Sequence, residues 1–515
     1  MKKGKIFRNI FTVGAFTAIS RVLGLVREML QSRIIGAGVE QSAFTLAFAL
    51  PNMARKLFGE GALTAAFVPV FKAEAENASM ERAERLARAV MTMSLAMLAA
   101  ITALAFFGLE CFASWRGESA LSPRAQLTFR LVKILLPYMI FICGAAFGMG
   151  VLNALGRFKA SSAMPCLLNV VWIGALLWLC FAPGLDIETR VCRVAAAILA
   201  AGALQFLFML WRMSRAGVRA LPSFRGWRDE NVRRVWRNTA IAAVGAGAVQ
   251  INYMLDQVLA QYAAPWAAGV IGYAERLMDL PLGIVGVAFG TVLLPTFAGF
   301  FAKGDLGGAR GALSSSLRGL MLVMLPSAAG LFILAPEITS VIYEGRAFDA
   351  TATLRVSRSV AVYALGLGFF GFQKSLVPWF QAQNDMKTPL RVSLFTVVMN
   401  AALNILAVAL LPEEWRHVGL AVSTVVCAGV GCMMLTVLAR RKNGALGLGE
   451  VSADIAKIAV ASVAMAFAVW KAKAFLSGVN GIVALGAEVA LGAVVYGVLV
   501  FVLIGRKGFV KSCRN

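Results

Sequence analysis

LPNMARKLFGEGALTAAFVPVF, at residues 50–71, is an apolar stretch framed by two prolines and interrupted by charged residues. LPLGIVGVAFGTVLLPTF, at residues 280–297, has the same frame: Leu-Pro opens it, and a second proline stands two residues before a phenylalanine. The two pairs of prolines are offset by 230 and 226 residues, and Pro165 and Pro389 are offset by 224. Proline is common in apolar helices, so one pair alone would mean little. Three nearly equal offsets predict that the chain consists of two halves related by an internal repeat.

Apolar runs of about 20 residues recur along the whole chain, which is the length that a membrane-spanning helix needs. The 515 residues are 59% hydrophobic and only 15% charged, whereas ordinary globular chains are about 25% charged. The sequence therefore predicts an all-α polytopic membrane protein with about 14 transmembrane helices. The predicted spans lie at 9–35, 43–71, 86–110, 128–155, 162–182, 191–212, 239–263, 267–301, 313–335, 357–381, 390–411, 417–439, 452–475 and 482–504.

Positive charge gathers in alternate connections between these runs. The formal net charge is +24, and Lys and Arg cluster at 72–88, 215–237, 440–442 and 506–514. Cytoplasmic loops of membrane proteins collect such residues, so both termini are predicted to be cytoplasmic. This placement explains the charge without a nucleic-acid partner. The predicted domains are an N-terminal lobe at 1–216, a basic linker at 217–237, a C-terminal lobe at 238–442, and two further helices with a tail at 443–515.

Several kinds of active site are disfavoured by residue content. The chain has one histidine, His417, and eight scattered cysteines without a CxxC pair. A Ser-His-Asp triad or a multi-histidine metal site is therefore nearly excluded, and no GxxxxGK[ST] phosphate loop occurs. We predict no catalytic residue, no metal ligand and no cofactor, and we leave a coupling cation open.

The strongest functional signal is a set of charged residues inside apolar runs. A charge at the centre of a span costs about 2.5–3.5 kcal/mol on insertion scales, so these groups must face protein, water or each other. Lys56 with Glu60 and Arg276 with Asp279 have the spacing of residues on one helix face, as do Arg21 and Glu28. Arg130 and Lys133 lie near the outer part of the fourth run. The central set consists of five bases and four acids: Arg21, Arg27, Glu28, Arg55, Lys56, Glu60, Glu275, Arg276 and Asp279.

Two interpretations of this set differ in what the charges do. Closed ion pairs could hold helices together, but four acids do not neutralise five bases. Arginine suits phosphate because its planar fork donates two parallel hydrogen bonds. The sequence predicts that Arg21, Arg27, Arg55 and Arg276 line a wet cavity for a diphosphate. The carboxylates could tune the arginines or bind a coupling cation. Gly59 and Gly61, which flank Glu60, favour a bend or close packing.

The motifs that carry these charges resemble those of a known family, the MurJ (MviN) lipid II flippases. Ser20-Arg21-Val22-Leu23-Gly24-Leu25-Val26-Arg27-Glu28 is similar to that family's first-helix motif. Residues 48–62 with 66–69 resemble its second helix, and residues 273–281 with 290–295 resemble its eighth. The outer-loop stretch 344–349 matches less tightly.

The resemblance implies a bacterial exporter of the MATE-like superfamily, with two six-helix lobes in a V and two C-terminal helices that line a groove for a polyprenyl tail. The implied substrate is lipid II, the undecaprenyl-diphosphate-linked precursor of peptidoglycan. Carried to matching positions, the substrate-binding cations are Arg21, Arg27, Arg55 and Arg276. The implied supporting or gate residues are Glu28, Glu60, Lys56, Glu275 and Asp279, with Glu60 in a thin gate between the lobes. One departure is Ser42, which stands where many members have an acid.

The expected mechanism is alternating access in the cytoplasmic membrane, driven by membrane potential or an ion gradient. The expected partners are lipid II, membrane lipids and proteins of cell-wall synthesis. A flippase for another polyprenyl-linked oligosaccharide remains an alternative, because the arginines do not identify the sugar. A cation-coupled drug antiporter should prefer net negative charge. A membrane glycosyltransferase should show a tight acidic motif, and a scaffold would not need so many buried charges.

Overall fold

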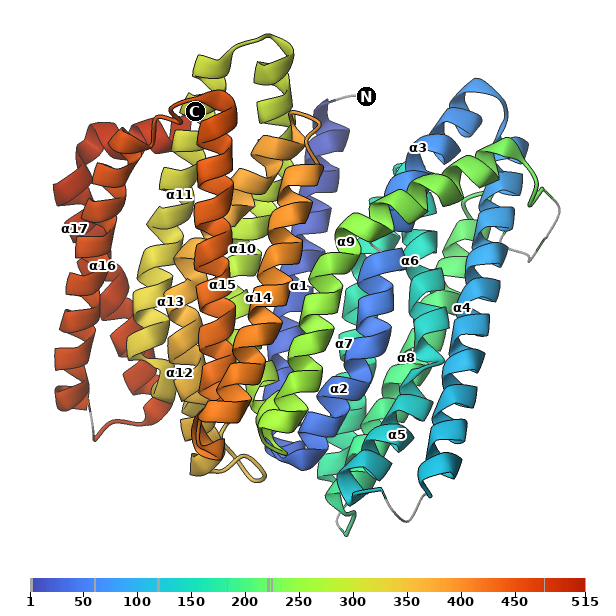
Figure 1. Cartoon of the computed structure of the whole chain (residues 1–515), viewed down its shortest axis with the longest axis horizontal. Helices are drawn as coiled ribbons and strands as arrows, with labels where there is room; N and C mark the ends of the chain where they lie inside the picture. The colour runs from blue at the N-terminus through green and yellow to red at the C-terminus, as the bar shows by residue number, and fades with distance from the viewer. Residues whose placement is uncertain are drawn as a thin grey trace. The chain divides into compact units, whose positions relative to one another are not determined.

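The computed structural model describes residues 3–59, 62–117, 121–182, 184–219, 223, 226–476 and 478–514. Over these residues the backbone is helical, apart from turns and one isolated bridge between Gly345 and Phe348 (Figure 1). The elements are α1 (Lys3–Ile35), α2 (Val39–Ala54), the π-helix η1 (Arg55–Gly59), α3 (Ala62–Asn77), α4 (Met80–Arg116), α5 (Pro123–Leu135), α6 (Tyr138–Ala154), α7 (Phe158–Cys180), α8 (Ile187–Ser214), α9 (Glu230–Ala263), α10 (Ala267–Ala302), α11 (Leu306–Ile333), α12 (Ala335–Tyr343), α13 (Ala350–Gln381), α14 (Lys387–Leu410), α15 (Glu413–Asn443), α16 (Leu448–Leu476) and α17 (Gly481–Arg514).

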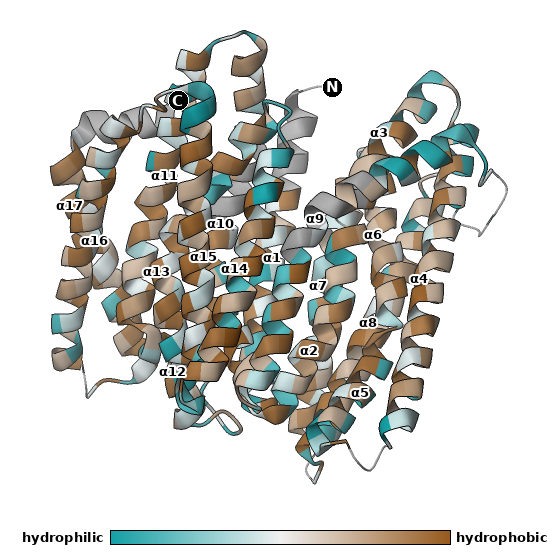
Figure 2. Cartoon of the chain, viewed as in Figure 1, coloured by the Kyte–Doolittle hydropathy of each residue, from teal (hydrophilic) through white to brown (hydrophobic). Residues whose placement is uncertain are grey.

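Ten helical segments among the described residues are long and apolar enough to cross a membrane. They coincide with ten of the predicted spans and confirm a polytopic all-α membrane protein. Figure 2 shows hydrophobic residues along these segments and hydrophilic residues at many of their ends. The four other predicted spans, at 9–35, 43–71, 239–263 and 267–301, fall on α1, on α2 to α3, on α9 and on α10. The total of fourteen therefore stays a prediction.

The chain folds as two compact units. Unit 1 comprises Met1–Val258 together with Gly345–Phe348, and unit 2 comprises Leu259–Glu344 together with Asp349–Asn515. The boundaries predicted from sequence at 216, 237 and 442 stay predictions. Each unit has its own packed helices.

Small residues bring the helices of unit 1 close together. α6 packs against α8, and a Cβ added at Gly202 of α8 would lie 2.4 Å from Cδ2 of Tyr138. A Cβ at Gly144 of α6 would likewise lie 2.6 Å from the Phe206 ring. Glycine at helix crossings lets two backbones approach within a membrane, where packing replaces the hydrophobic effect as the attractive force. α6 and α8 are therefore closely packed against each other.

Unit 2 is organised around α13, which packs against α10, α11, α12 and α15. Near the end of α13, Trp379 is fully buried, and the Phe297 and Phe301 rings of α10 meet it edge-on at centroid distances of 5.4 and 5.0 Å. α16 packs against α11 and α17. The Tyr496 hydroxyl of α17 donates to the Leu322 carbonyl of α11 at 2.7 Å. α16 and α17 are thus attached to the body of unit 2.

Short polar residues set the starts of several helices. Asp186 accepts a hydrogen bond from the Thr189 backbone N–H at the start of α8, and Ser79, Ser122, Asp305 and Asp349 act in the same way at other helices. Hydrogen bonds from the Thr189 side chain and backbone lower the pKa of the Asp186 carboxyl. Such caps satisfy backbone donors that a helix leaves unpaired.

The run predicted as one span at 43–71 is not one regular helix. α2 ends at Ala54, the next five residues form η1, and α3 begins at Ala62. Pro51 lies inside α2 and cannot donate its backbone nitrogen. The Arg55 N–H bonds the carbonyls of Asn52 and Pro51. π-turns are uncommon and often occur at functional positions, and this one opens on a predicted site residue.

Candidate functional site

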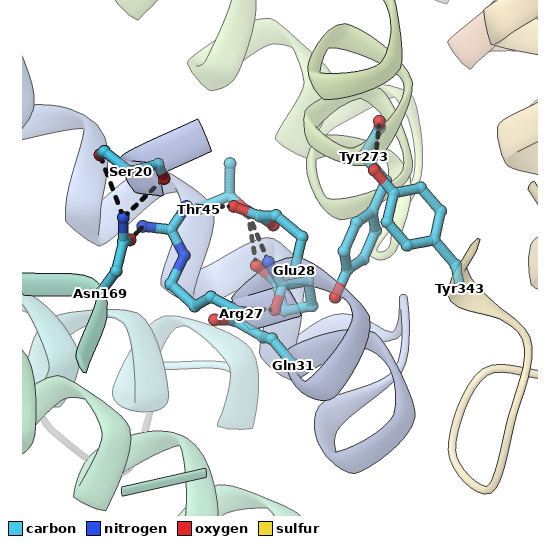
Figure 3. A network of polar contacts seen from close by, with 9 residues as sticks. Ser20, Arg27, Glu28, Gln31, Thr45, Asn169, Tyr273 and Tyr343 are labelled. Carbon is cyan, nitrogen blue, oxygen red and sulfur yellow. Dashed lines mark hydrogen bonds and ion pairs between the residues drawn. The ribbon is translucent and has the colours of Figure 1, made fainter. Parts of the chain in front are cut away.

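Arg27 of α1 is held by three side chains. Its Nη1 donates to Asn169 Oδ1 on α7 at 3.0 Å, and its guanidinium carbon lies 4.3 Å from the centroid of the Trp172 ring, also on α7. Its Nη2 forms an ion pair with the neighbouring Glu28 (Figure 3). The Arg27 and Glu28 side chains are only 12% and 14% exposed. One carboxylate, one amide and one aromatic face therefore fix the position of this arginine.

Asn169 links Arg27 to the preceding turns of α1. Its Nδ2 donates to the Ser20 carbonyl at 3.1 Å and to the Ser20 hydroxyl at 3.4 Å. Its oxygen is at the same time the acceptor for Arg27. The oxygen of the Asn169 amide can only accept and its nitrogen can only donate. The two contacts together therefore fix the register of α7 against α1.

A second chain of polar contacts joins α1 to α2. Gln31 Nε2 donates to Gln41 Oε1 at 2.9 Å, and Gln41 Nε2 donates to Thr45 Oγ1 at 3.3 Å. Both glutamines are buried, and Ser42 beside them is fully buried. Thus the position at which the family often has an acid lies inside unit 1, next to neutral amides.

Arg21 has a different environment, six residues before Arg27 on α1. It is exposed, and it lines a cavity of about 430 Å³ between α1, α6 and α7. The other polar groups of this cavity are Thr17, Ser20, Asn153, Ser161 and Ser162. Within the part of the chain that the structure describes, the Arg21 guanidinium has no hydrogen bond or ion pair. All five of its N–H donors are thus available to an anion.

Arg55 and Lys56 open the π-turn η1. Arg55 Nε and Nη2 both donate to Asn52 Oδ1, at 3.2 and 2.9 Å. Lys56 Nζ lies 5.3 Å from the centroid of the Tyr253 ring on α9. Glu60 lies outside the described residues, so its predicted pairing with Lys56 stays a prediction.

The fourth predicted arginine lies in unit 2. Glu275, Arg276 and Asp279 are on α10, where Arg276 and Asp279 are exposed and Glu275 is half-buried. Close to them in sequence, the Tyr273 carbonyl accepts a hydrogen bond from the Tyr343 hydroxyl at 3.3 Å, as Figure 3 also shows. The convergence of the four arginines on one cavity stays a prediction.

The structure refines two expectations and adds two residues. Glu28 does share the α1 helix with Arg21, and it forms an ion pair with Arg27. The sequence placed Arg21 and Arg27 in one group. In the structure Arg27 is bound by neighbouring side chains, whereas Arg21 lines a cavity and is available to a ligand. Asn169 and Trp172 were not predicted as part of the site. An amide and an indole inside the apolar run 162–182 were the signal that could have identified them.

Comparison with known proteins gives consistent results. A family model described as "Lipid II flippase MurJ" matches residues 31–487. A protein of Rhizobium tropici named as a probable lipid II flippase MurJ is 32% identical over 463 residues, which cover 89% of this chain and 86% of the relative. Arg21 and Arg27 precede the family match, so their roles depend on the geometry above.

Two solved structures have the same fold. A lipid II flippase MurJ in an inward closed conformation has a TM-score of 0.77 and 22% sequence identity, and the alignment covers 96% of this chain and 98% of that one. An inward-facing multidrug MATE-family transporter of the MOP superfamily has a TM-score of 0.67 and 15% identity, with coverages of 84% and 96%. At these identities the likeness concerns the fold alone, and it confirms the MATE-like fold class.

Proposed function

Because this chain belongs to the lipid II flippase MurJ family, we propose that it moves lipid II from the inner to the outer leaflet of the bacterial cytoplasmic membrane. The family is one of transporters, and the chain is a multi-pass membrane protein. The observation that supports a role for specific atoms is the position of Arg21: its guanidinium, unpaired among the described residues, lines a cavity that also has hydroxyl and amide groups on its wall.

In this proposal Arg21 binds the diphosphate of the substrate. Its exposed planar fork can donate two parallel hydrogen bonds to phosphate oxygens, a fixed geometry that a lysine ammonium does not offer. The hydroxyl groups of Thr17, Ser20, Ser161 and Ser162 border the same cavity and offer polar contacts to the sugar. The cavity lies within unit 1, between α1, α6 and α7.

Arg27 then positions the site and supplies positive potential. Its Nη groups are engaged by Glu28 and Asn169, and its face by Trp172. An arginine so held cannot turn to follow a ligand, but it keeps α1 in register with α7. Asn169 also donates a hydrogen bond to the Ser20 carbonyl, and this contact fixes the position of the helical turn that contains Arg21.

The remaining predicted residues contribute to later steps. Arg55 and Lys56 on η1 and Arg276 on α10 would bind the diphosphate as the accessible side of the cavity changes. Glu28, Glu60, Glu275 and Asp279 would limit the positive charge so that the product can leave. A coupling cation would bind among these acids.

Alternating access would be driven by the membrane potential or an ion gradient, with both termini in the cytoplasm. Moving one negative charge outward across an inside-negative membrane releases about 2.3 kcal/mol per 100 mV. A diphosphate therefore carries enough charge for export without ATP. Proteins of cell-wall synthesis would supply and consume the substrate.

The test uses the full chain in proteoliposomes, with separate assays for lipid II, an unrelated polyprenyl-diphosphate oligosaccharide and a cationic dye. The expected result is transport of lipid II in preference to both others, accelerated by an inside-negative potential. Equal transport of the other oligosaccharide would favour the broader flippase. Transport of the dye alone would refute the proposal.

A further inference from the structure

A second cavity of unit 1, of about 570 Å³, differs sharply from the one beside Arg21. It lies between α2, η1, α4 and α5, and every residue that lines it is apolar. Ile101 and Phe112 of α4 are each 41% exposed at its border. The cavity is therefore a groove that opens on the outer surface of the helices.

We propose that this groove binds one acyl chain of a bilayer phospholipid. α4 and the α5–α6 segment are long and apolar enough to span the membrane, so the groove lies at the depth of the hydrocarbon core. Water is disfavoured there because the wall offers it no hydrogen-bond partner. An empty groove would lose the van der Waals contacts of its lining, which a chain from the adjacent leaflet restores.

The charged and aromatic residues at one end of the groove match a phospholipid rather than a bare hydrocarbon. Lys133 of α5 pairs with Glu110 of α4 at 2.6 Å, and their side chains are 33% and 60% exposed. The Phe112 and Phe129 rings, which line the groove, meet edge-on at 5.8 Å, and Trp115 beyond them is 79% exposed. Aromatic and basic residues of this kind anchor proteins at the headgroup level. The Lys133 ammonium can share its charge with a lipid phosphate.

The chain in this groove would support the segment that carries Arg55. Leu57 and Phe58 of η1 line the groove, and Arg55 and Lys56 precede them in the same π-turn. A π-helical turn is rare, and side-chain packing against Leu57 and Phe58 helps to hold this one. The lipid therefore stabilises the local conformation from which the two cations extend. Binding of lipid in this groove can be measured without transport, and it does not depend on the identity of the proposed substrate.

Gly108 offers a way to fill the groove without disturbing the fold. It lines the groove, and a Cβ at this position would meet no atom within 4 Å. Gly108→Leu should thus occupy the space that the acyl chain takes. Gly174→Leu is the matched control, because Gly174 is exposed on the membrane span α7 with equally open space around it. Both changes raise helix propensity by a similar amount.

The experiment reconstitutes the full chain in vesicles containing a phospholipid with a photoreactive group in the middle of one acyl chain, and identifies the labelled peptides. The expected result is labelling within 98–112 or 129–139 in the wild type, lowered about tenfold in Gly108→Leu and unchanged in Gly174→Leu. Ala105→Phe, also in the groove lining, serves as the second variant if Gly108→Leu fails to fold.

The proposal is overturned if the wild type is not labelled in these segments, or if Gly108→Leu is labelled as strongly as Gly174→Leu. A parallel arm uses an isoprenyl phosphate with the same photoreactive group. Labelling of the groove by this probe and not by the phospholipid would show that the occupant is a polyprenyl chain, which also overturns the proposal. Since the readout is labelling, its failure is distinguishable from a failure of transport.

Discussion

Charged side chains lie against apolar helices in two regions of the molecule, and the two regions balance their charges differently. On α16 of unit 2, Asp454 pairs with Arg318 of α11 at 2.7 Å, and Lys473 pairs with Glu337 of α12 at 2.8 Å. Within residues 20–28 of α1 in unit 1, Arg21 and Arg27 accompany the single acid Glu28, and the additional partners of Arg27 are neutral. Matched pairs hold helices together, whereas an excess cation is available to a ligand.

The positions of the matched pairs support this distinction. Asp454 and Lys473 are near opposite ends of α16. At the rise per residue of an α-helix, the two positions are about 28 Å apart along the helix axis. This is close to the thickness of the hydrocarbon core, about 30 Å. A separation of this size lets both pairs lie near its boundaries, where charges cost less, and each pair attaches α16 to the body of unit 2.

The largest expected effect comes from removing the held arginine. Arg27→Ala removes the ion pair with the nearly buried Glu28 and the hydrogen bond to Asn169. Loss of one partner of a buried pair costs about 3–5 kcal/mol, so thermal unfolding in detergent should occur at a markedly lower temperature. Arg27→Ala with Glu28→Gln should recover part of this loss. Unfolding of Arg27→Ala at the wild-type temperature would contradict the positioning role.

A substitution on α7 could give Arg27 of α1 a second acidic partner and so match its charges as the pairs of α16 are matched. Asn169→Asp would supply a second carboxylate beside Arg27 and so neutralise the excess charge of α1. A new negative charge at about 8 Å opposes an anion by about 2 kcal/mol at an effective dielectric constant of 20. Affinity for lipid II should fall at least tenfold, and the unfolding temperature should also fall because a carboxylate cannot donate to the Ser20 carbonyl as Asn169 does. Asn169→Gln is the neutral control, and equal loss of affinity in both variants would point to packing instead of charge.

The matched pair at the end of α16 should matter for stability alone. Lys473→Met removes the partner of Glu337, the donor to the Ile333 carbonyl and the positive charge beside the buried Glu488. Because the Lys473 and Glu337 side chains are 23% and 35% exposed, we expect a loss of only about 1 kcal/mol. The affinity for lipid II should be unchanged, as measured on the same preparation. A tenfold loss of affinity would show that matched pairs also serve the substrate.

The smallest effect is expected for a matched pair outside the spans. Burial tends to raise the pKa of the Asp385 carboxyl, but hydrogen bonds from Lys442 and Thr388 outweigh it and lower the pKa to about 2. Its usual value is ~3.9. A lowered pKa stabilises the fold above about pH 4, and this contribution is lost as the pH falls through 2. Asp385→Asn should therefore reduce stability at pH 6 by at most about 1 kcal/mol, and the difference from wild type should vanish at pH 2. A constant difference across this range would exclude the carboxylate as its cause.

Sequence predicted the fold class and ten of the described spans because apolar length determines membrane insertion. It also identified the arginines, since a charge within a span is rare. It could not separate Arg21 from Arg27, because that difference depends on which face of α1 meets Asn169 and Trp172 of α7. The π-turn η1 was not predicted either. Proline and glycine indicate a bend in a helix, but they do not specify which hydrogen bonds replace the regular ones.

The most direct test of the central claim is the dissociation constant of the purified full chain for lipid II, compared between Arg21→Ala, Arg21→Lys and Lys473→Met. The loss of a charge-assisted hydrogen bond of about 1.5–3 kcal/mol predicts that Arg21→Ala binds about 10- to 100-fold more weakly. Arg21→Lys should lie between it and the wild type, and Lys473→Met should bind normally. All three should unfold within a few degrees of the wild type. A wild-type dissociation constant for Arg21→Ala would contradict the claim that Arg21 binds the diphosphate.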